Sequence, residues 1–253
     1  MKEEIKMNAG RITINHMSFG YDGSRKIFEN FSLKVNPGER VGIVGENGVG
    51  KSTLLRLIAG LNIDFSGDIL INDIGVSKKT LKDIRKDMGY VFQDADNQLF
   101  MSTVYEDVAF APRNYGMRGS ALDACVKQAL AKVGIEELFD RPVYHLSGGE
   151  KKLASIAGVL AMEPGIIMFD EPGVALDPRN RMNLINILNE LSQTILITSH
   201  DMDFILDTCD RTILLYKGSI IKDGKSKDIL FDKKVLEDCG LMLPLSAKYK
   251  KIT

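Results

Sequence analysis

The amino-acid sequence contains no tryptophan, only three cysteines and no long apolar run. Cys125, Cys209 and Cys239 stand far apart and lack the spacing of metal ligands, so we expect reduced structural thiols. No apolar stretch approaches the roughly eighteen residues that a membrane-spanning helix needs. The opening residues, MKEEIKMNAG, lack the charged-then-apolar plan of a signal peptide. We therefore expect a chain that stays in the cytoplasm.

The sequence also has no excess of positive charge, because it contains 33 lysines and arginines and 34 aspartates and glutamates. The formal net charge of -1 argues against a nucleic-acid partner, whose phosphates require a basic surface. The rest of the composition is that of an ordinary globular protein, with 44% hydrophobic and 26% charged residues. A length of 253 residues accommodates one large domain or two closely joined ones.

The hydrophobic pattern predicts an α/β fold that a helical insert interrupts. Short apolar or alternating runs that end in turns are typical of strands. The expected strands are residues 12–19, 31–35, 41–44, 68–71, 88–92, 166–169, 194–198 and 212–216. Between residues 103 and 160, apolar positions recur at helical intervals instead. A helix expected over residues 179–191 joins two of the strands, which implies that these strands are parallel.

Residues 45–53 read GENGVGKST and fit the phosphate-loop pattern G-x-x-x-x-G-K-[ST] between an expected strand and an expected helix. Without a Cβ atom at Gly48 and Gly50, the backbone can turn tightly and direct its N–H groups at phosphate oxygens. The helix that follows offers its positive end, Lys51 a mobile charge, and Ser52 a hydroxyl for Mg²⁺. A plain glycine-rich turn is the alternative, and the strand and helix around the loop argue against it. The predicted ATP-binding residues here are Gly45, Glu46, Asn47, Gly48, Val49, Gly50, Lys51, Ser52 and Thr53.

Two carboxylates end the apolar run of residues 166–171, IIMFDE. Ligands of an open parallel sheet bind beyond the carboxyl ends of its strands, so both acids are expected to face the phosphates. Asp170 would hold Mg²⁺, and Glu171 would polarise the attacking water. Acids that merely end a strand in solvent are the alternative, and the phosphate loop in the same chain favours the functional interpretation.

The turn of residues 145–150, HLSGGE, precedes an amphipathic helix expected over residues 151–162. Ser147 suits the N-terminal cap of that helix. Gly148 and Gly149 expose backbone N–H groups at its positive end. On the residues alone, a plain helix cap is favoured over a second anion site.

The order of these motifs resembles the ATPase subunit of ATP-binding cassette (ABC) transporters. The matching pieces are GENGVGKST, YVFQ, LSGGE, IIMFDEP, ALDP and ITSHD. The resemblance covers residues 19 to about 224 and implies a P-loop NTPase (ABC ATPase) core with an N-terminal antiparallel β region and a helical subdomain insert. It places residues 10–93 and 164–230 in the core, 94–163 in the helical subdomain with the signature motif, and 231–253 in a C-terminal tail.

The resemblance also implies roles that the residues alone left open. Tyr21 resembles the aromatic residue that stacks on adenine. Gln93 resembles the glutamine that touches Mg²⁺ and the attacking water, and His200 the histidine that contacts the γ-phosphate. The predicted catalytic residues are then Glu171, His200 and Gln93, and the predicted Mg²⁺ ligands are Ser52, Gln93 and Asp170.

A head-to-tail dimer is a further implication of the resemblance. In this family each ATP lies between the phosphate loop of one subunit and the LSGGE turn, here called the signature turn, of the other. A twofold axis relates the two sites. Asp177, in the ALDP motif, resembles the acid that crosses the dimer interface. The residues that would complete the partner's site are Ser147, Gly148, Gly149 and Glu150.

The segment after Gln93, DADNQLFMSTVYEDVAFAPRNYG, resembles energy-coupling-factor ATPases. These work at the cytoplasmic face of the membrane with a transmembrane scaffold protein and a membrane substrate-binding component. The stretches HDMDFILDTCDRTILLYKG and CGLMLPLS resemble the cobalt and nickel group, which implies uptake of those ions. Vitamin uptake is an alternative, and a soluble ABC ATPase of translation or DNA repair is another, which the single cassette and the lack of basic bias argue against.

Some positions depart from the family pattern. Glu150 stands where Gln is frequent, Leu153 where Arg is frequent, and Gly173 where Thr is usual. Ala175 replaces a frequent Gly, and Asp94-Ala95 replaces Asn-Pro. The Leu153 departure puts a polar contact of the signature helix in doubt. Gly173 adds backbone freedom beside Glu171, so we expect slow basal turnover.

Overall fold

The computed structural model describes residues 9–21, 26–174 and 176–249 of the chain. Its strands are β1 (Ile12–Phe19), β2 (Phe28–Val35), β3 (Arg40–Val44), β4 (Ser66–Ile71), β5 (Ile74–Gly75), β6 (Met88–Val91), β7 (Ile166–Asp170), β8 (Thr194–Thr198), β9 (Arg211–Tyr216) and β10 (Ser219–Lys225). Its helices are α1 (Lys51–Ile58), α2 (Leu81–Ile84), α3 (Val104–Asn114), α4 (Gly119–Val133), α5 (Gly148–Leu160), α6 (Pro178–Glu190), α7 (Met202–Thr208), α8 (Ser226–Leu230), α9 (Lys233–Asp238) and α10 (Leu245–Tyr249). Ala175, the first residue of the ALDP motif, lies outside the described residues.

Six strands form the larger sheet, in the order β10-β9-β3-β8-β7-β6. The five strands β9, β3, β8, β7 and β6 are parallel, and β10 pairs antiparallel with β9 at one edge. The parallel pairing of β7 with β8 is the one expected from the helix between them. Because these strands run in one direction, the carboxyl ends of β3, β7 and β8 meet at one edge of the sheet.

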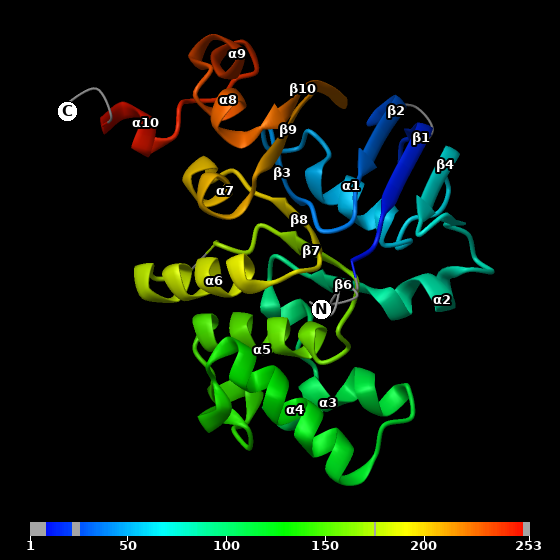
Figure 1. Cartoon of the computed structure of the whole chain (residues 1–253), viewed down its shortest axis with the longest axis vertical. Helices are drawn as coiled ribbons and strands as arrows, with labels where there is room; N and C mark the ends of the chain where they lie inside the picture. Colours follow the sequence, from blue (N-terminus) through cyan, green and yellow to red (C-terminus); the bar gives the residue numbers. More distant parts are fainter. Residues whose placement is uncertain (1–8, 22–25, 175, 250–253) are drawn as a thin grey trace, which may run out of the picture.

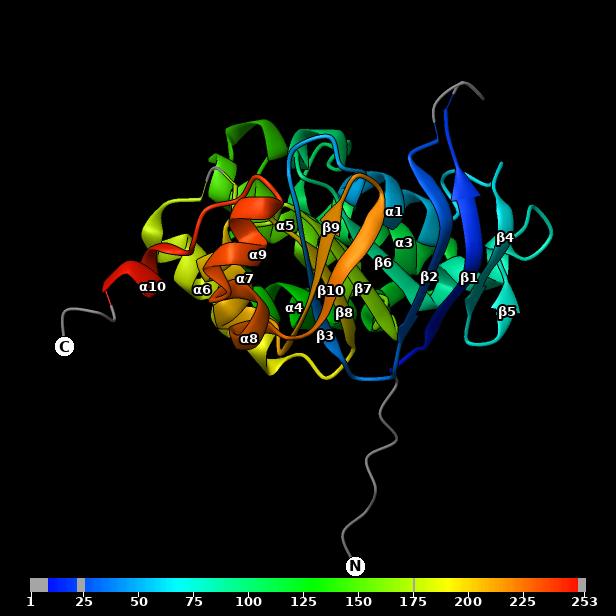
Figure 2. The ribbon, with the colours of Figure 1, turned by 90° about the horizontal axis from the view of Figure 1, so that it is seen from above.

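A second sheet is antiparallel throughout, in the order β2-β1-β4-β5. Figure 2 shows it at one side of the molecule, beyond α1. β2 begins at Phe28, earlier than expected, because its pairing with β1 continues past two register shifts, one on each side of Met17, to Phe19 opposite Phe28. Such a bulge breaks the period-two pattern from which the strand was predicted.

The insert between β6 and β7 consists of α3, α4 and α5, which gather at one end of the molecule in Figure 1. Thr103 caps the start of α3 by accepting a hydrogen bond from the Glu106 backbone N–H, and Gly134 ends α4 in the left-handed conformation. The helical spacing expected in α4 is confirmed by its buried residues, Leu122, Val126, Ala129, Leu130 and Val133.

Two hydrophobic clusters lie on opposite faces of the six-stranded sheet. In β7, Ile167 and Phe169 join the cluster of α3–α7, whereas Ile166 and Met168 join the cluster of α1 and the antiparallel sheet. Successive residues of a strand point to opposite faces, so an all-apolar strand supplies both clusters. The helical insert therefore packs on the same core as α6 and α7. The fold class expected from the sequence is confirmed.

The chain continues past β10 as α8, α9 and α10, which lie beyond the edge of the sheet in Figure 1. Gly240, just after α9, approaches the phosphate loop so closely that a Cβ atom there would collide with the Glu46 carboxylate. The C-terminal segment is thus packed against the loop. Among the described residues, no helix is long and apolar enough to pass through a membrane.

Candidate functional site

The phosphate loop connects the end of β3 to the start of α1. Gly50 occupies the N-terminal cap of α1 with φ at 111°, and a Cβ atom there would come within 2.8 Å of the Ile27 and Phe28 side chains. Gly48 has φ at 79° in open space, so only its backbone conformation favours glycine. The loop therefore takes the tight curve that the GENGVGKST pattern predicts.

A cleft of about 340 Å³ opens along this loop. Three polar side chains from outside the loop also line it: Gln93 after β6, Glu171 after β7 and His200 after β8. The structure thus brings the three predicted catalytic residues to the predicted ATP-binding loop. The loop residues that line the cleft are Asn47, Gly48, Gly50, Lys51, Ser52 and Thr53.

Lys51 is buried at the floor of the loop and is 7% exposed. Its Nζ donates to the backbone oxygens of Gly45 at 2.8 Å and Glu46 at 3.2 Å, and lies 3.9 Å from Glu171 Oε1. Burial lowers the pKa of Lys51, whereas the carboxylates of Glu171 and Asp170 act in the opposite direction. A lysine ammonium here supplies the positive charge that phosphate oxygens require.

Asp170 ends β7 and is 4% exposed. Its Oδ1 accepts hydrogen bonds from Ser52 Oγ at 2.9 Å and Thr198 Oγ1 at 2.7 Å, and its Oδ2 accepts one from the Tyr90 hydroxyl at 3.1 Å. Burial, together with the Asp170 carboxylate, raises the pKa of Tyr90 well above its usual range, so that Tyr90 stays a donor. Carboxylate and hydroxyl oxygens are the ligands that Mg²⁺ prefers, so the donor set fits that ion.

Glu171 has φ at 47°, a left-handed conformation that is strained for a residue with a side chain. The Glu171 backbone N–H donates to the backbone oxygen of Thr198 at 3.0 Å, which holds the turn. The Glu171 Oε2 atom accepts a hydrogen bond from the His200 backbone N–H at 3.1 Å and lies 2.8 Å from His200 Nδ1. The Glu171 carboxylate is buried, whereas the His200 ring is exposed. This pair places a carboxylate and an imidazole together at the cleft.

Gly173 was expected to add backbone freedom beside Glu171. Gly173 does not have a positive φ, and a Cβ atom there would make ordinary contact, at 3.4 Å, with the Phe204 ring. The unusual backbone conformation belongs to Glu171 itself. Slow basal turnover stays a prediction.

Tyr21 lies beside the loop rather than among the side chains that line the cleft. It is 54% exposed, its hydroxyl is 3.3 Å from Thr53 Oγ1, and its ring packs edge-on against Phe19 at 5.0 Å. Residues 22–25, which follow it, lie outside the described part of the chain. Its stacking on adenine stays a prediction.

Ser147 caps α5 through a reciprocal capping box. Its Oγ accepts a hydrogen bond from the Glu150 backbone N–H at 3.3 Å, and Glu150 Oε2 accepts one from the Ser147 backbone N–H at 2.7 Å. Ser147 and Gly148 are exposed, and neither lines the cleft of their own chain. The cap expected from the sequence is confirmed, and the turn is presented outward.

Asp177 caps α6 next to this turn. Its Oδ1 accepts from the backbone N–H groups of Arg179 at 2.9 Å and Asn180 at 3.0 Å, which lowers the pKa of the Asp177 carboxyl. The Asn180 side chain lies over Gly149, where a Cβ atom would collide with it. The two motifs that the family resemblance assigns to the dimer interface are therefore neighbours within one chain.

Three polar residues of the site were missed from the sequence: Tyr90, Thr198 and Lys152. Thr198 and Tyr90 are polar positions in apolar strands, a signal that could have drawn attention to them. Lys152 is 3% exposed on the buried face of α5, and burial lowers its pKa to about 8 against the pull of Asp94 and Asp170. A lysine on an apolar helix face was a similar signal.

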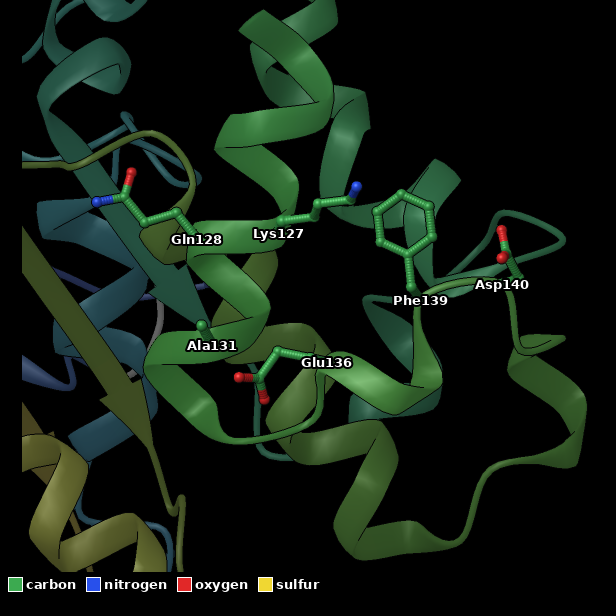
Figure 3. Close-up of a pocket in the computed structure, with 6 residues that line it drawn as sticks. All are labelled: Lys127, Gln128, Ala131, Glu136, Phe139 and Asp140. Atoms are coloured by element: carbon green, nitrogen blue, oxygen red, sulfur yellow. The ribbon is translucent and has the colours of Figure 1, made fainter. Parts of the chain in front are cut away.

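A second hollow, of about 650 Å³, lies on the helical insert. Figure 3 shows its lining side chains, from α4 and the segment that follows. Lys127 Nζ lies 5.7 Å from the centroid of the Phe139 ring, and Glu136 and Asp140 flank them. This hollow shares no lining residue with the nucleotide cleft. Within the described residues, no group of three or more His, Cys, Asp or Glu side chains could hold a metal ion.

Comparison with known proteins assigns this chain to a family. The family profile described as ABC transporter matches residues 28–174, more than half of the chain. The chain belongs to the ABC transporter family. Within that family it is an ATPase subunit, as the motif order predicted.

Relatives in other organisms extend the match beyond those residues. The energy-coupling factor transporter ATP-binding protein EcfA of Methanocaldococcus jannaschii is 40% identical over 231 residues, which are 89% of this chain and 83% of that protein. The EcfA of Carboxydothermus hydrogenoformans is 39% identical over 240 residues, 94% of this chain and 88% of that protein. The solved structure of cbiO1 from Clostridium perfringens, described as part of the ABC transporter complex cbiONQ, superposes with a TM-score of 0.81 at 34% identity and covers 95% of this chain and 98% of that one.

Proposed function

We propose that this chain is the ATP-hydrolysing subunit of an energy-coupling-factor importer and works at the cytoplasmic face of the cell membrane. The observation that carries the proposal is the division of its motifs. The phosphate loop, Glu171 and His200 line one cleft, and Asp170 bonds to Ser52 of that loop. The signature turn is presented outside this cleft. The EcfA relatives support the importer type.

The same division supports a head-to-tail dimer with a second ATPase subunit, either a copy of this chain or a sister chain. Each ATP would lie between one phosphate loop and the partner's signature turn, and Asp177 would reach across the interface. The start of α5 suits a phosphate because Gly148 is exposed at the positive end of the helix, next to the capping box that uses the N–H groups of Ser147 and Glu150. Ser147, Gly148, Gly149 and Glu150 would complete the partner's site.

Within one site, Lys51 and the loop N–H groups would bind the phosphates of ATP. Ser52, Asp170 and Gln93 would hold Mg²⁺, which supplies charge neutralisation between the phosphate oxygens. Glu171 would accept a hydrogen bond from the attacking water and orient it toward the γ-phosphate, and His200 would contact that phosphate. The His200 contact with Glu171 fixes the carboxylate in the cleft before the water arrives.

We propose cobalt or nickel as the transported ion. The sequence resemblance of residues 200–218 and 239–246 to that group supports this assignment. A transmembrane scaffold and a membrane substrate-binding component would bind the cargo.

The first test is the variant Glu171→Gln, which keeps the size of the side chain and removes its charge. It should bind ATP as the wild type does and sediment as an ATP-dependent dimer. Its rate of ATP hydrolysis should be lower by a factor of about 100 or more. Lys51→Ala serves as the control that should lose ATP affinity and the dimer. Normal turnover by Glu171→Gln, measured as phosphate release, would exclude the assigned role.

The second test concerns the cargo. Membrane proteins that co-purify with the chain are reconstituted with it in vesicles, and ATP-dependent accumulation of Co²⁺, Ni²⁺ and riboflavin is measured. We expect metal accumulation that Glu171→Gln abolishes. Accumulation of riboflavin alone would contradict the metal assignment and indicate a vitamin importer.

A further inference from the structure

Lys152 lies on α5, two residues after the signature turn, and its ammonium group is enclosed in the protein. Its Nζ donates to the backbone oxygens of Phe92 at 2.8 Å and Gln93 at 2.7 Å. A buried ammonium is costly unless it is hydrogen-bonded, so these two acceptors fix where it sits. The backbone of Gln93 is thereby tied to the helix that carries the signature turn.

Gln98 provides a second tie between the same two segments. Its Oε1 accepts from the Phe92 backbone N–H at 3.1 Å, and its Nε2 donates to the Ser155 backbone oxygen at 2.9 Å. Phe92 is thus held through its oxygen by Lys152 and through its N–H by Gln98. We call the hydrogen bonds that the Lys152 and Gln98 side chains make between these two segments the α5 clamp.

Of residues 151–153, Lys152 is the one whose side chain bonds the backbone of Phe92 and Gln93. Leu153 follows it and is 4% exposed, but a leucine cannot donate a hydrogen bond. Lys151 precedes it and pairs instead with Asp96 at 2.6 Å, nearer the surface. A polar contact of this helix is therefore made by Lys152, the neighbour of Leu153.

The two ends of the clamp serve different nucleotide sites if the chain works as the proposed dimer, and the inference rests on that function. Gln93 lines the cleft of its own chain, whereas the start of α5 would face the partner's ATP in that dimer. We propose that Lys152 is a positioning residue that couples the two sites, because a shift of α5 when its turn binds the partner's ATP moves the Gln93 backbone. Gln93 then reaches its working position only after the partner's site is filled.

Three variants test the coupling in the full-length chain. Lys152→Met removes the donor at similar length, Lys152→Arg retains a donor, and Lys151→Met is the matched control that breaks only the outer ion pair. For Lys152→Met we expect kcat to fall about 10- to 100-fold with KM for ATP within about threefold, because a small misplacement of a reacting group costs that much. Lys152→Arg should recover most of kcat, and Lys151→Met should retain it.

Two measurements on the same proteins distinguish a positioning role of Lys152 from a purely structural one. The double variant Glu171→Gln, Lys152→Met should still bind ATP and form the ATP-dependent dimer, which requires an intact fold. A Lys152→Met protein with wild-type kcat, or one that loses ATP affinity and kcat in parallel, would overturn the proposal. If Lys152→Met does not fold, Gln98→Leu breaks the other half of the α5 clamp and should lower kcat in the same way.

Failure of the proposed function itself would be visible without any change at Lys152. The wild type would not hydrolyse ATP, or the Glu171→Gln variant would not form the ATP-dependent dimer.

Discussion

At the residue scale, the position of Asp170 depends on hydroxyl groups from three separate elements. Ser52 reaches it from α1, Tyr90 from β6 and Thr198 from β8. A buried carboxylate is stabilised by such donors, and each donor that is removed leaves a lone pair unsatisfied. Thr198 also donates to the backbone oxygen of Phe169, so it links the ends of β7 and β8.

We expect Thr198→Val to reduce both stability and the use of Mg²⁺. The free energy of unfolding should fall by about 1–3 kcal/mol, because a hydrogen bond to a charged acceptor is lost. The Mg²⁺ concentration for half-maximal ATP hydrolysis should rise severalfold, because Asp170 is held less firmly. Denaturant unfolding and a Mg²⁺ titration of phosphate release measure the two effects.

Thr194→Val is the matched control for that prediction, since Thr194 is buried at the other end of β8 and bonds to Gly38 and Gly10. It should lose stability and keep the wild-type Mg²⁺ dependence. Equal shifts in the Mg²⁺ titration of both variants would refute the specific role of Thr198.

At the element scale, α5 begins with the capping box and carries Lys152 on its buried face. The Ser147 backbone N–H bond lowers the pKa of Glu150 below its ordinary value of 4.5. A lowered pKa means that folding favours the ionised form, so this stabilisation is present above pH 4.5 and is lost as the pH falls through the folded-state pKa. The carboxylate also lies at the positive end of the helix.

Glu150→Gln should therefore be less stable than the wild type at neutral pH and equal to it in acid. A glutamine can accept the same backbone bond but carries no charge, and Glu150 is largely solvated, so the difference should be only about 0.3–0.5 kcal/mol. Urea unfolding of both proteins at neutral pH, and again below the folded-state pKa of Glu150, measures it. A gap that stays constant with pH would show that the charge does not contribute.

At the scale of the whole molecule, one sheet supports two cores and one edge of that sheet gathers the site. The parallel order of β3, β8 and β7 places the phosphate loop, His200 and Asp170-Glu171 at neighbouring carboxyl ends. The helical insert shares its cluster with α6 and α7, so the signature turn and the Asp177 cap lie side by side. This arrangement leaves the turn facing away from its own cleft.

Removal of Mg²⁺ should separate assembly from hydrolysis. With ATP and excess EDTA, the wild type should still form some dimer, because Lys51 and the N–H groups of the two motifs bind phosphate without the metal. ATP hydrolysis should fall to background and return on addition of Mg²⁺. Sedimentation and phosphate release on one sample check both parts, and hydrolysis that continues in EDTA would contradict the Mg²⁺ assignment.

Local features of the structure followed from the sequence. The phosphate loop needs glycines at positive φ, the strands are short apolar runs, and Ser147 caps α5 as expected. Each of these is a preference of neighbouring residues, so the linear pattern carries it. The start of β2 was misplaced, because a bulge in its pairing with β1 is not a local property.

Other features depended on the tertiary structure. Thr198 and Asp170 are 28 residues apart, Tyr90 and Asp170 are 80 apart, and Lys152 reaches a backbone oxygen 59 residues away at Gln93. No periodicity connects such positions, since only the packing of strands and helices brings them within hydrogen-bond distance. The sequence by itself determined which groups could bind and hydrolyse ATP. The tertiary structure decided which hydroxyls hold Asp170 and which lysine ties Gln93 to the signature helix, because both depend on burial and on contacts between distant segments.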